Sequence, residues 1–192
     1  STIVWQSPDG TFADHIPMFF KASESGNGCL LGHVARDNPL WRYASNQEVL
    51  VIFQGVNAYI SPNWYATKQE TGKAVPTWNY VAVHVYGKIR AIEDVTWISQ
   101  QLSTLTSLHE QSQAKPWKMT DAPPDYIERM INAVVGIEIE IMQIIGKSKM
   151  SQNQVIDNQQ SIGAALNGLN SEMAKSVANL VLGNHKDSTT NT

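Results

Sequence analysis

Residues 77–92 alternate between apolar and polar side chains with a period of two. Successive side chains of a β-strand point to opposite faces, so this pattern is typical of a strand with one buried face. Gly87 interrupts the alternation, and a glycine inside a strand indicates a bulge or sharp bend, a common device where a sheet curls into a barrel. The apolar face is formed by Val81, Val83, Val85 and Ile89, and the polar face by Tyr80, His84, Tyr86, Lys88 and Arg90.

Shorter β-rich segments surround this strand. A Ser-Pro-Asp-Gly turn at 7–10 predicts that the first two segments form a hairpin. Gly55 separates two further segments and makes them a second hairpin candidate. Isoleucines alternate with Glu138 and Glu140 in the last segment. The predicted strands are 2–6, 12–20, 29–35, 48–54, 57–61 and 137–146.

Helical patterns fall between and after the strands. Asp94 is placed to cap a helix with apolar positions from Trp97 to Leu108, and Asn38-Pro39 can open a short helix. Because the strands come in runs, the chain predicts a mainly β (α+β) fold, a small antiparallel barrel with peripheral helices. The longer predicted helices are 94–108, 124–134, 155–169 and 171–182, the last two forming a helical C-terminal tail. We expect the polar residues 184–192 to be disordered.

Composition narrows the classes of function. The chain has 192 residues, 42% of them apolar and 16% charged, which suits one globular domain and is too apolar for disorder. The formal charge of −3 and the scattered basic residues do not favour nucleic acid as the main partner. No apolar run is long enough to span a membrane, and the opening residues lack the pattern of a secretion signal. A single cysteine, Cys29, fits a reducing compartment, so we expect a cytoplasmic protein.

Several common sites are not supported by their spacing. The glycines at 26, 28 and 32 do not match a dinucleotide fingerprint, since a strand and not a helix follows them. Gly146-Lys147-Ser148 lacks the earlier glycine of a phosphate-binding P-loop. The five histidines never occur at the i, i+4 spacing of a helical metal pair, so no metal site is predicted.

Four stretches combine hydrogen-bonding side chains with large aromatic residues. Eight of the twelve Trp and Tyr residues lie between Trp41 and Tyr86, where they can stack on a ligand or fill a core. Loops at strand ends are where a rigid barrel presents groups to a ligand. The stretches are Gly-His-Val-Ala-Arg-Asp-Asn-Pro-Leu-Trp at 32–41, Tyr-Ile-Ser-Pro-Asn-Trp-Tyr at 59–65, Val-Pro-Thr-Trp-Asn-Tyr at 75–80 and Gly-Lys-Ser-Lys-Met-Ser-Gln-Asn at 146–153.

With these four motifs in order, most of residues 1–155 resemble the PaiB-type FMN-binding regulators. That family belongs to the split-barrel flavoproteins, which include pyridoxamine phosphate oxidases and flavin reductases. The resemblance implies an FMN-binding split β-barrel that forms a homodimer, with FMN in a cleft at the subunit interface. Relatives have been described as negative transcriptional regulators. Members usually carry a further N-terminal segment, with a helix, before the strand that begins here at Thr2.

The resemblance also implies which residues bind FMN. A phosphate needs cations or hydroxyl and amide donors, and the matching positions hold Arg36, Asn38, Ser61 and Lys149. Each cation has a second interpretation: Arg36 can pair with an acid such as Asp37 or with a carbonyl, and Lys149 can be an exposed lysine at the end of a strand.

The isoalloxazine ring needs a flat apolar slot with hydrogen-bond donors at its edge. Trp64, Trp78, Thr77 and Asn79 match these needs, although both tryptophans can instead belong to the core or a dimer interface. The remaining expected contacts are His33 with ring or ribityl chain (or as a structural histidine), the strand at His15 through its backbone, and Gln152 and Asn153 as a partial match.

We therefore expect a split-barrel domain over 1–153, a helical extension over 154–183 and the tail at 184–192. The leading hypothesis is a flavin reductase-like oxidoreductase that takes electrons from NAD(P)H through FMN. The alternative is an FMN-binding negative regulator with little or no turnover, for which DNA is the partner despite the acidic charge. A third is an interaction module without a cofactor. The sequence identifies no catalytic residue.

Overall fold

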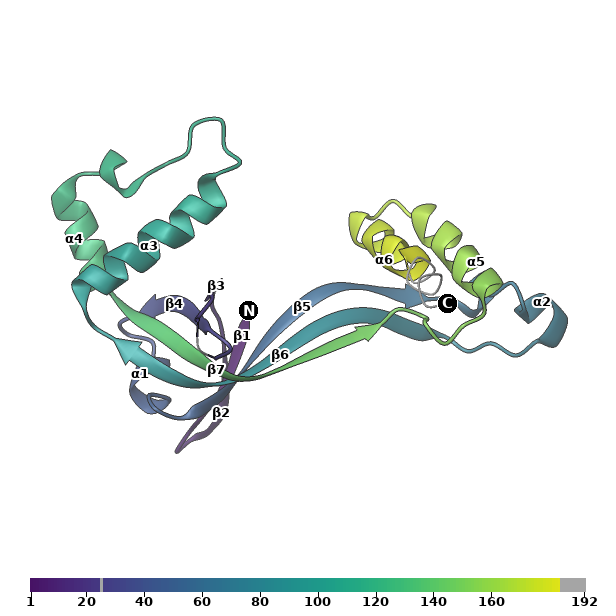
Figure 1. Ribbon diagram of the computed structural model, residues 1–192, viewed down its shortest axis with the longest axis horizontal. Coiled ribbons are helices and arrows are strands. Elements are labelled where there is room, and N and C mark those ends of the chain that lie inside the picture. Colours follow the sequence, from purple (N-terminus) through teal and green to yellow (C-terminus); the bar gives the residue numbers. More distant parts are fainter. Residues whose placement is uncertain (25, 184–192) are drawn as a thin grey trace. The chain divides into compact units, whose positions relative to one another are not determined.

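The computed structural model describes residues 1–24 and 26–183, so the tail predicted to be disordered, 184–192, lies outside the described residues. The chain divides into two compact units (Figure 1). Unit 1 contains Ser1–Phe53 and His84–Ile145. Unit 2 contains Gln54–Val83 and the described residues from Gly146 onward. Neither unit is a continuous stretch of sequence.

Seven strands form one sheet in the order β2-β1-β5-β6-β7-β4-β3. Strands β1 and β2 form the predicted hairpin, with antiparallel register from Thr2 opposite His15 to Ser7 opposite Gly10. The predicted strand at 12–20 is divided, because β2 ends at His15 and a new strand forms one edge of the sheet. The strands are β1 (Thr2–Ser7), β2 (Gly10–His15), β3 (Phe19–Lys21), β4 (Cys29–Ala35), β5 (Glu48–Ile60), β6 (Thr77–Ile92) and β7 (Val134–Lys149).

The second predicted hairpin is wrong, since β5 continues through Gly55. The neighbouring strand explains this glycine: a Cβ at Gly55 would lie 3.2 Å from both the Cβ and the backbone oxygen of Val81 on β6. The residue therefore permits close packing between two strands and does not mark a turn.

The long alternating strand is confirmed as β6, with Val85 and Ile89 buried and Lys88 and Arg90 exposed. It also continues through its glycine. A Cβ at Gly87 would collide with the backbone oxygen of Glu140 on β7, so the small residue allows the strands to approach.

The expected helices are present, with bounds shifted by a few residues. The Asp94 carboxylate accepts a hydrogen bond of 2.7 Å from the backbone N–H of Trp97, which confirms the predicted cap. On α4 only part of the predicted stripe faces inward: Ile131 is buried, whereas Tyr126 and Met130 are exposed. The helices are α1 (Leu40–Tyr43), α2 (Lys68–Thr71), α3 (Val95–Glu110), α4 (Pro124–Asn132), α5 (Ile156–Asn167) and α6 (Glu172–Gly183), with short 3₁₀ turns η1 (Pro62–Trp64) and η2 (Met119–Asp121).

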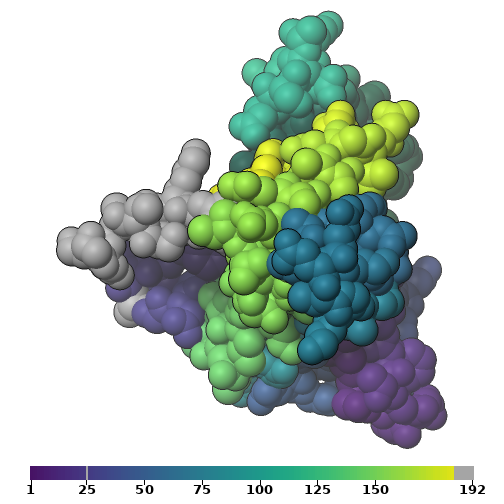
Figure 2. All heavy atoms as spheres, turned by 90° about the vertical axis from the view of Figure 1, so that its right-hand side faces the viewer, coloured from purple at the N-terminus to yellow at the C-terminus, as the bar shows by residue number. Residues whose placement is uncertain are grey.

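The core of unit 2 lies between its strands and the two C-terminal helices. Ala58 and Ile60 of β5 pack in one apolar cluster with Ile162 of α5 and Val177 of α6. Figure 2 shows α5, in yellow-green, against the blue segment that contains η1 and α2. Because one side of these strands is covered by helices, the alternate side chains point the other way.

In unit 1, α3 packs near β4, and the Ile98 side chain of α3 is buried. Among the described residues, no helix is long and apolar enough to cross a membrane.

Candidate functional site

Large aromatic side chains are exposed on the strands of unit 2. Trp78 is 55% exposed and Tyr59 is 46% exposed, and their ring centroids lie 6.1 Å apart in an edge-to-face arrangement. Tyr59 lies between the buried residues Ala58 and Ile60, so it points away from the helix-covered side. Exposed aromatic rings in the middle of a sheet offer a flat surface for stacking a planar ligand.

A hollow of about 210 Å³ lies beside the Trp78 ring. Its wall combines Trp78 and Tyr80 with the amide side chains of Gln54 and Asn57. An apolar surface with a few amide groups suits a heterocyclic ring with polar edges. The volume is below the roughly 300–1,000 Å³ typical of small-molecule pockets, so this hollow alone does not enclose a ligand of FMN size.

A cation lies beside Thr77, the first residue of β6, whose side chain the alternation of the strand turns to the opposite face from Trp78. The Lys149 Nζ at the end of β7 donates a 2.5 Å hydrogen bond to the Thr77 Oγ1, and Thr77 directly precedes Trp78. This contact is with a neutral hydroxyl, so the positive charge of Lys149 is not balanced by it. An ammonium and a hydroxyl together are a suitable donor pair for a phosphate.

These donors fit the group that the resemblance implies. The Trp78 ring provides a stacking surface for an isoalloxazine, and the Lys149–Thr77 pair provides charge-assisted donors for a phosphate. The fit rests on residues of unit 2 alone.

The other predicted residues of the 59–80 region are hydrogen-bonded or packed within unit 2. Asn79 is fully buried, and its amide donates to the Ser151 hydroxyl over 2.9 Å. The Ser61 hydroxyl caps η1 by accepting from the backbone N–H of Asn63. Trp64 is half-buried against the apolar cluster, so its ring serves the core. In this structure these three side chains support the fold.

The last predicted motif forms a turn after β7. The Gln152 amide oxygen accepts from the backbone N–H of Met150, and its nitrogen donates to the carbonyl of Ser148. Gln152 therefore holds the end of the strand that carries Lys149. Asn153 follows it and is exposed.

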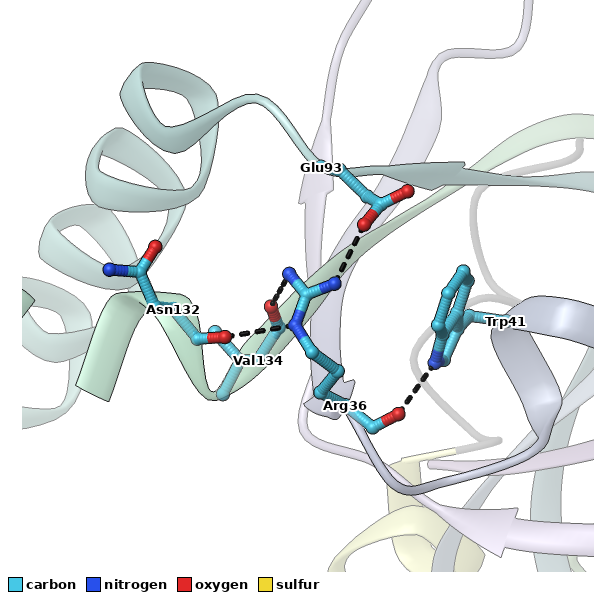
Figure 3. Close-up of polar contacts among 5 residues, drawn as sticks. All are labelled: Arg36, Trp41, Glu93, Asn132 and Val134. Carbon is cyan, nitrogen blue, oxygen red and sulfur yellow. Dashed lines mark hydrogen bonds and ion pairs between the residues drawn. The ribbon is translucent and has the colours of Figure 1, made fainter. Parts of the chain in front are cut away.

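Arg36 lies in unit 1 and has several protein acceptors (Figure 3). Its Nη1 donates to the Glu93 carboxylate at 2.6 Å, and its Nε and Nη2 donate to the backbone carbonyls of Asn132 and Val134. The backbone oxygen of Arg36 also accepts from the Trp41 indole. Arg36 therefore pairs both with an acid and with backbone carbonyls, the two structural roles considered for it, and the acid is Glu93 and not Asp37.

The other predicted residues of unit 1 are also hydrogen-bonded. The His33 Nδ1 lies 3.0 Å from the Gln101 Oε1, and burial lowers the pKa of His33, an effect that this hydrogen bond partly offsets. Asn38 donates to Asp14 and accepts from the backbone N–H of Leu40. His15 contacts the Thr2 hydroxyl at 3.1 Å.

Of the predicted set, the structure thus brings Thr77 and Lys149 into contact within unit 2, and Trp78 follows Thr77 in the strand. Sequence reasoning missed Gln54 and Asn57 because it ended a strand near them. Had β5 been recognised as continuous, a period of two would have placed Asn57 beside Tyr59 on one face, opposite Ala58 and Ile60.

Comparison with known proteins supports FMN as the cofactor. The family model described as "Putative FMN-binding domain" matches residues 1–143. The chain is 31% identical over 181 residues to the protease synthase and sporulation protein PAI 2 of Bacillus subtilis, covering 94% of this chain and 84% of that protein. It is 34% identical over 201 residues to the uncharacterized protein AN0679 of Emericella nidulans, covering 88% of this chain and 80% of that one.

Among solved structures, the flavocytochrome Anf3 of Azotobacter vinelandii superposes with a TM-score of 0.53 at 13% identity. The match covers 77% of this chain and 60% of that chain. This likeness concerns the fold, and it confirms the predicted α+β split barrel with peripheral helices. With the family model covering most of its length, the chain belongs to the FMN-binding domain family, a family of split-barrel flavoproteins whose cofactor is FMN.

Proposed function

We propose that this protein binds FMN at the start of β6 in unit 2, with the ring on the exposed Trp78 face and the phosphate reaching past the strand end to Thr77 and Lys149, and that it uses FMN to transfer electrons from a nicotinamide nucleotide. The observation that carries the proposal is the pairing of an exposed tryptophan, Trp78, with the Lys149–Thr77 donor pair one residue away. Ring stacking and phosphate binding are the two separate demands that FMN makes on a protein.

Each residue then has a defined task. Trp78 stacks on the ring of FMN, and Tyr59 supports the Trp78 indole through an edge-to-face contact. Lys149 and Thr77 bind the phosphate, and Gln152 fixes the strand end from which Lys149 extends. Asn57 and Gln54 offer amide groups to the polar edge of the ring. Bound FMN supplies the redox chemistry, while the protein binds and orients it.

A second copy of the chain is proposed to complete the site. The hollow of about 210 Å³ is too small for FMN, and the aromatic surface around it is exposed. A surface with exposed aromatic rings is typical of a protein interface. Closure of two such faces would shield both sides of the ring from water.

The first experiment measures binding of FMN and riboflavin by quenching of flavin fluorescence. The Trp78→Ala variant should weaken both ligands about 10-fold or more, since stacking on an aromatic ring is worth about 1–3 kcal/mol by comparison with bases on aromatic platforms. Trp117→Ala is the matched control, because Trp117 is also exposed but lies in unit 1. Equal binding by the wild type and Trp78→Ala would contradict the site.

A second experiment separates the two functions considered for the family. Steady oxidation of NADH or NADPH that depends on added FMN supports electron transfer. The regulator hypothesis instead requires a mobility shift with upstream DNA and a steep dependence on salt. The charge of −3 favours the first outcome. Tight DNA binding without turnover of either nucleotide would overturn the electron-transfer proposal.

A further inference from the structure

Unit 1 contains its own hollow of about 310 Å³, between α3 and the strands β3 and β4. All of its lining residues belong to unit 1, so it is separate from the proposed FMN face. Its volume lies at the lower end of the range for small-molecule sites, roughly 300–1,000 Å³. The lining residues are Phe19, Lys21, Leu31, Trp97, Gln100, Gln101 and Thr104.

Gln101 is the unusual member of this lining. Its side chain is only 3% exposed, and the other buried residue of helix α3 is the apolar Ile98. One end of its amide pairs with His33, while the nitrogen Nε2 is buried without a hydrogen-bond partner. Buried amide groups nearly always have partners, because leaving one unpaired is unfavourable.

The hollow offers Gln101 a place to find that partner. The terminal torsion of a glutamine is soft, so a small rotation turns the amide nitrogen toward a molecule held there. The neutral form of His33 is favoured by burial, which lowers its pKa. A neutral imidazole with its proton on Nδ1 donates to the Gln101 oxygen and leaves the amide nitrogen as a donor for a ligand.

Two further side chains around the hollow can donate hydrogen bonds. Lys21 brings an ammonium and Gln100 a second amide, whereas the Thr104 hydroxyl donates its proton to the backbone carbonyl of Gln100. No carboxylate is part of the lining. The apolar part consists of two aromatic rings, Phe19 and Trp97, and the aliphatic Leu31. Hydrogen-bond donors next to a cation favour a ligand with an anionic acceptor group. Aromatic side chains favour a ligand with a flat apolar ring.

We propose that this hollow is a binding site for a small aromatic carboxylate, with its carboxylate on Gln101 and Lys21 and its ring between Phe19 and Trp97. The Gln101 amide donates a hydrogen bond to the carboxylate, and Lys21 supplies the positive charge that favours an anion. The proposal is independent of FMN, because it uses no residue of the Trp78 face.

Benzoate is the probe, and the indole N–H resonance of Trp97 is the reporter. A ¹H–¹⁵N NMR titration of the full chain follows this resonance, which the Trp97→Phe variant assigns by its disappearance. We expect a saturable shift with benzoate. Neutral benzamide should bind at least about 10-fold more weakly than benzoate, because it cannot form the charge-assisted hydrogen bonds. Benzylammonium should not compete.

Two variants test the assigned residues against matched controls. Gln101→Met keeps the side-chain length and removes the amide, and we expect it to weaken benzoate about 10-fold. The control is Gln159→Met, because Gln159 is a second buried glutamine with an unpaired amide atom, in unit 2. Lys21→Met should weaken benzoate several-fold and remain folded, since Lys21 is exposed; Lys73→Met is its control.

Three results would overturn the proposal. Benzamide or benzylammonium binding as tightly as benzoate would show that the site does not select an anion. Equal benzoate affinity in Gln101→Met, Lys21→Met and the wild type would remove both residues from the site. A shift of the Trp97 resonance that grows linearly without saturating would show a solvent effect only.

Discussion

Arg36 in unit 1 and Lys149 in unit 2 are two cations with opposite surroundings. The Arg36 guanidinium donates to one carboxylate and two backbone carbonyls, so its charge and its geometry are both used within the protein. Within residues 1–24 and 26–183, the one hydrogen-bond partner recorded for the Lys149 ammonium is a neutral hydroxyl at 2.5 Å. Both were candidates for the same phosphate, and the comparison teaches that a cation is available to a ligand only where the fold leaves its charge uncompensated.

The largest effect is expected for Lys149→Ala. Loss of a charge-assisted contact should weaken FMN about 10- to 100-fold and leave riboflavin almost unchanged, because only FMN carries the phosphate. Fluorescence titration with both ligands measures the ratio. Equal losses for FMN and riboflavin would remove Lys149 from the phosphate site. Lys147→Ala, two residues earlier on β7, is the control.

Arg36→Ala should mainly affect stability. It removes an exposed ion pair with Glu93, which contributes little to stability, and two charged hydrogen bonds to the carbonyls of Asn132 at the end of α4 and Val134 at the start of β7. We expect a loss of about 2 kcal/mol in the free energy of unfolding, measured with urea. Arg42→Ala, which affects only an exposed arginine over Trp41, should cost less than this.

The same Arg36→Ala protein sharpens the comparison when FMN and riboflavin are titrated. If Arg36 serves only unit 1, the ratio of the two affinities stays at the wild-type value. A loss of affinity for FMN but not for riboflavin would instead show that Arg36 also binds the phosphate, as the family resemblance implies. An arginine whose charge is paired within the protein would then still contact a ligand.

A smaller effect is expected from His33. Burial lowers the pKa of His33 below its unfolded value, so at acidic pH the unfolded chain binds more protons than the folded one. Stability should therefore fall as the pH drops below about 6.5, the unfolded value, and level off below the folded pKa. Urea unfolding at several pH values measures this slope, and His33→Gln should flatten it. An unchanged slope in the variant would assign the acid sensitivity to other groups.

Local patterns predicted most of the fold. Alternation identified β6, the Pro-Asp-Gly turn identified the first hairpin, and Asp94 identified the start of α3, since each signal lies within a few neighbouring residues. Gly55 misled because a glycine that lets two strands pack closely has the same sequence signature as one that turns the chain.

The site was less accessible to sequence reasoning. The three acceptors of the Arg36 side chain lie 57, 96 and 98 residues away along the chain, so no neighbouring residue indicates that its guanidinium is already hydrogen-bonded. The burial of Asn79 depends on Ser151, another distant residue. Trp78 and Lys149 could be named from their motifs, whereas Asn57 and Gln101 required knowledge of which face of a strand or helix is covered.

The three long strands carry the backbone across the boundary between the two units, between Phe53 and Gln54, Val83 and His84, and Ile145 and Gly146. Neither unit is therefore an exchangeable module. A gene fragment that ends before Gly146 would encode strand halves whose helical cover, with Ile162 and Val177, is missing. Recombination at the apparent boundaries should therefore expose this apolar strand surface and yield insoluble products.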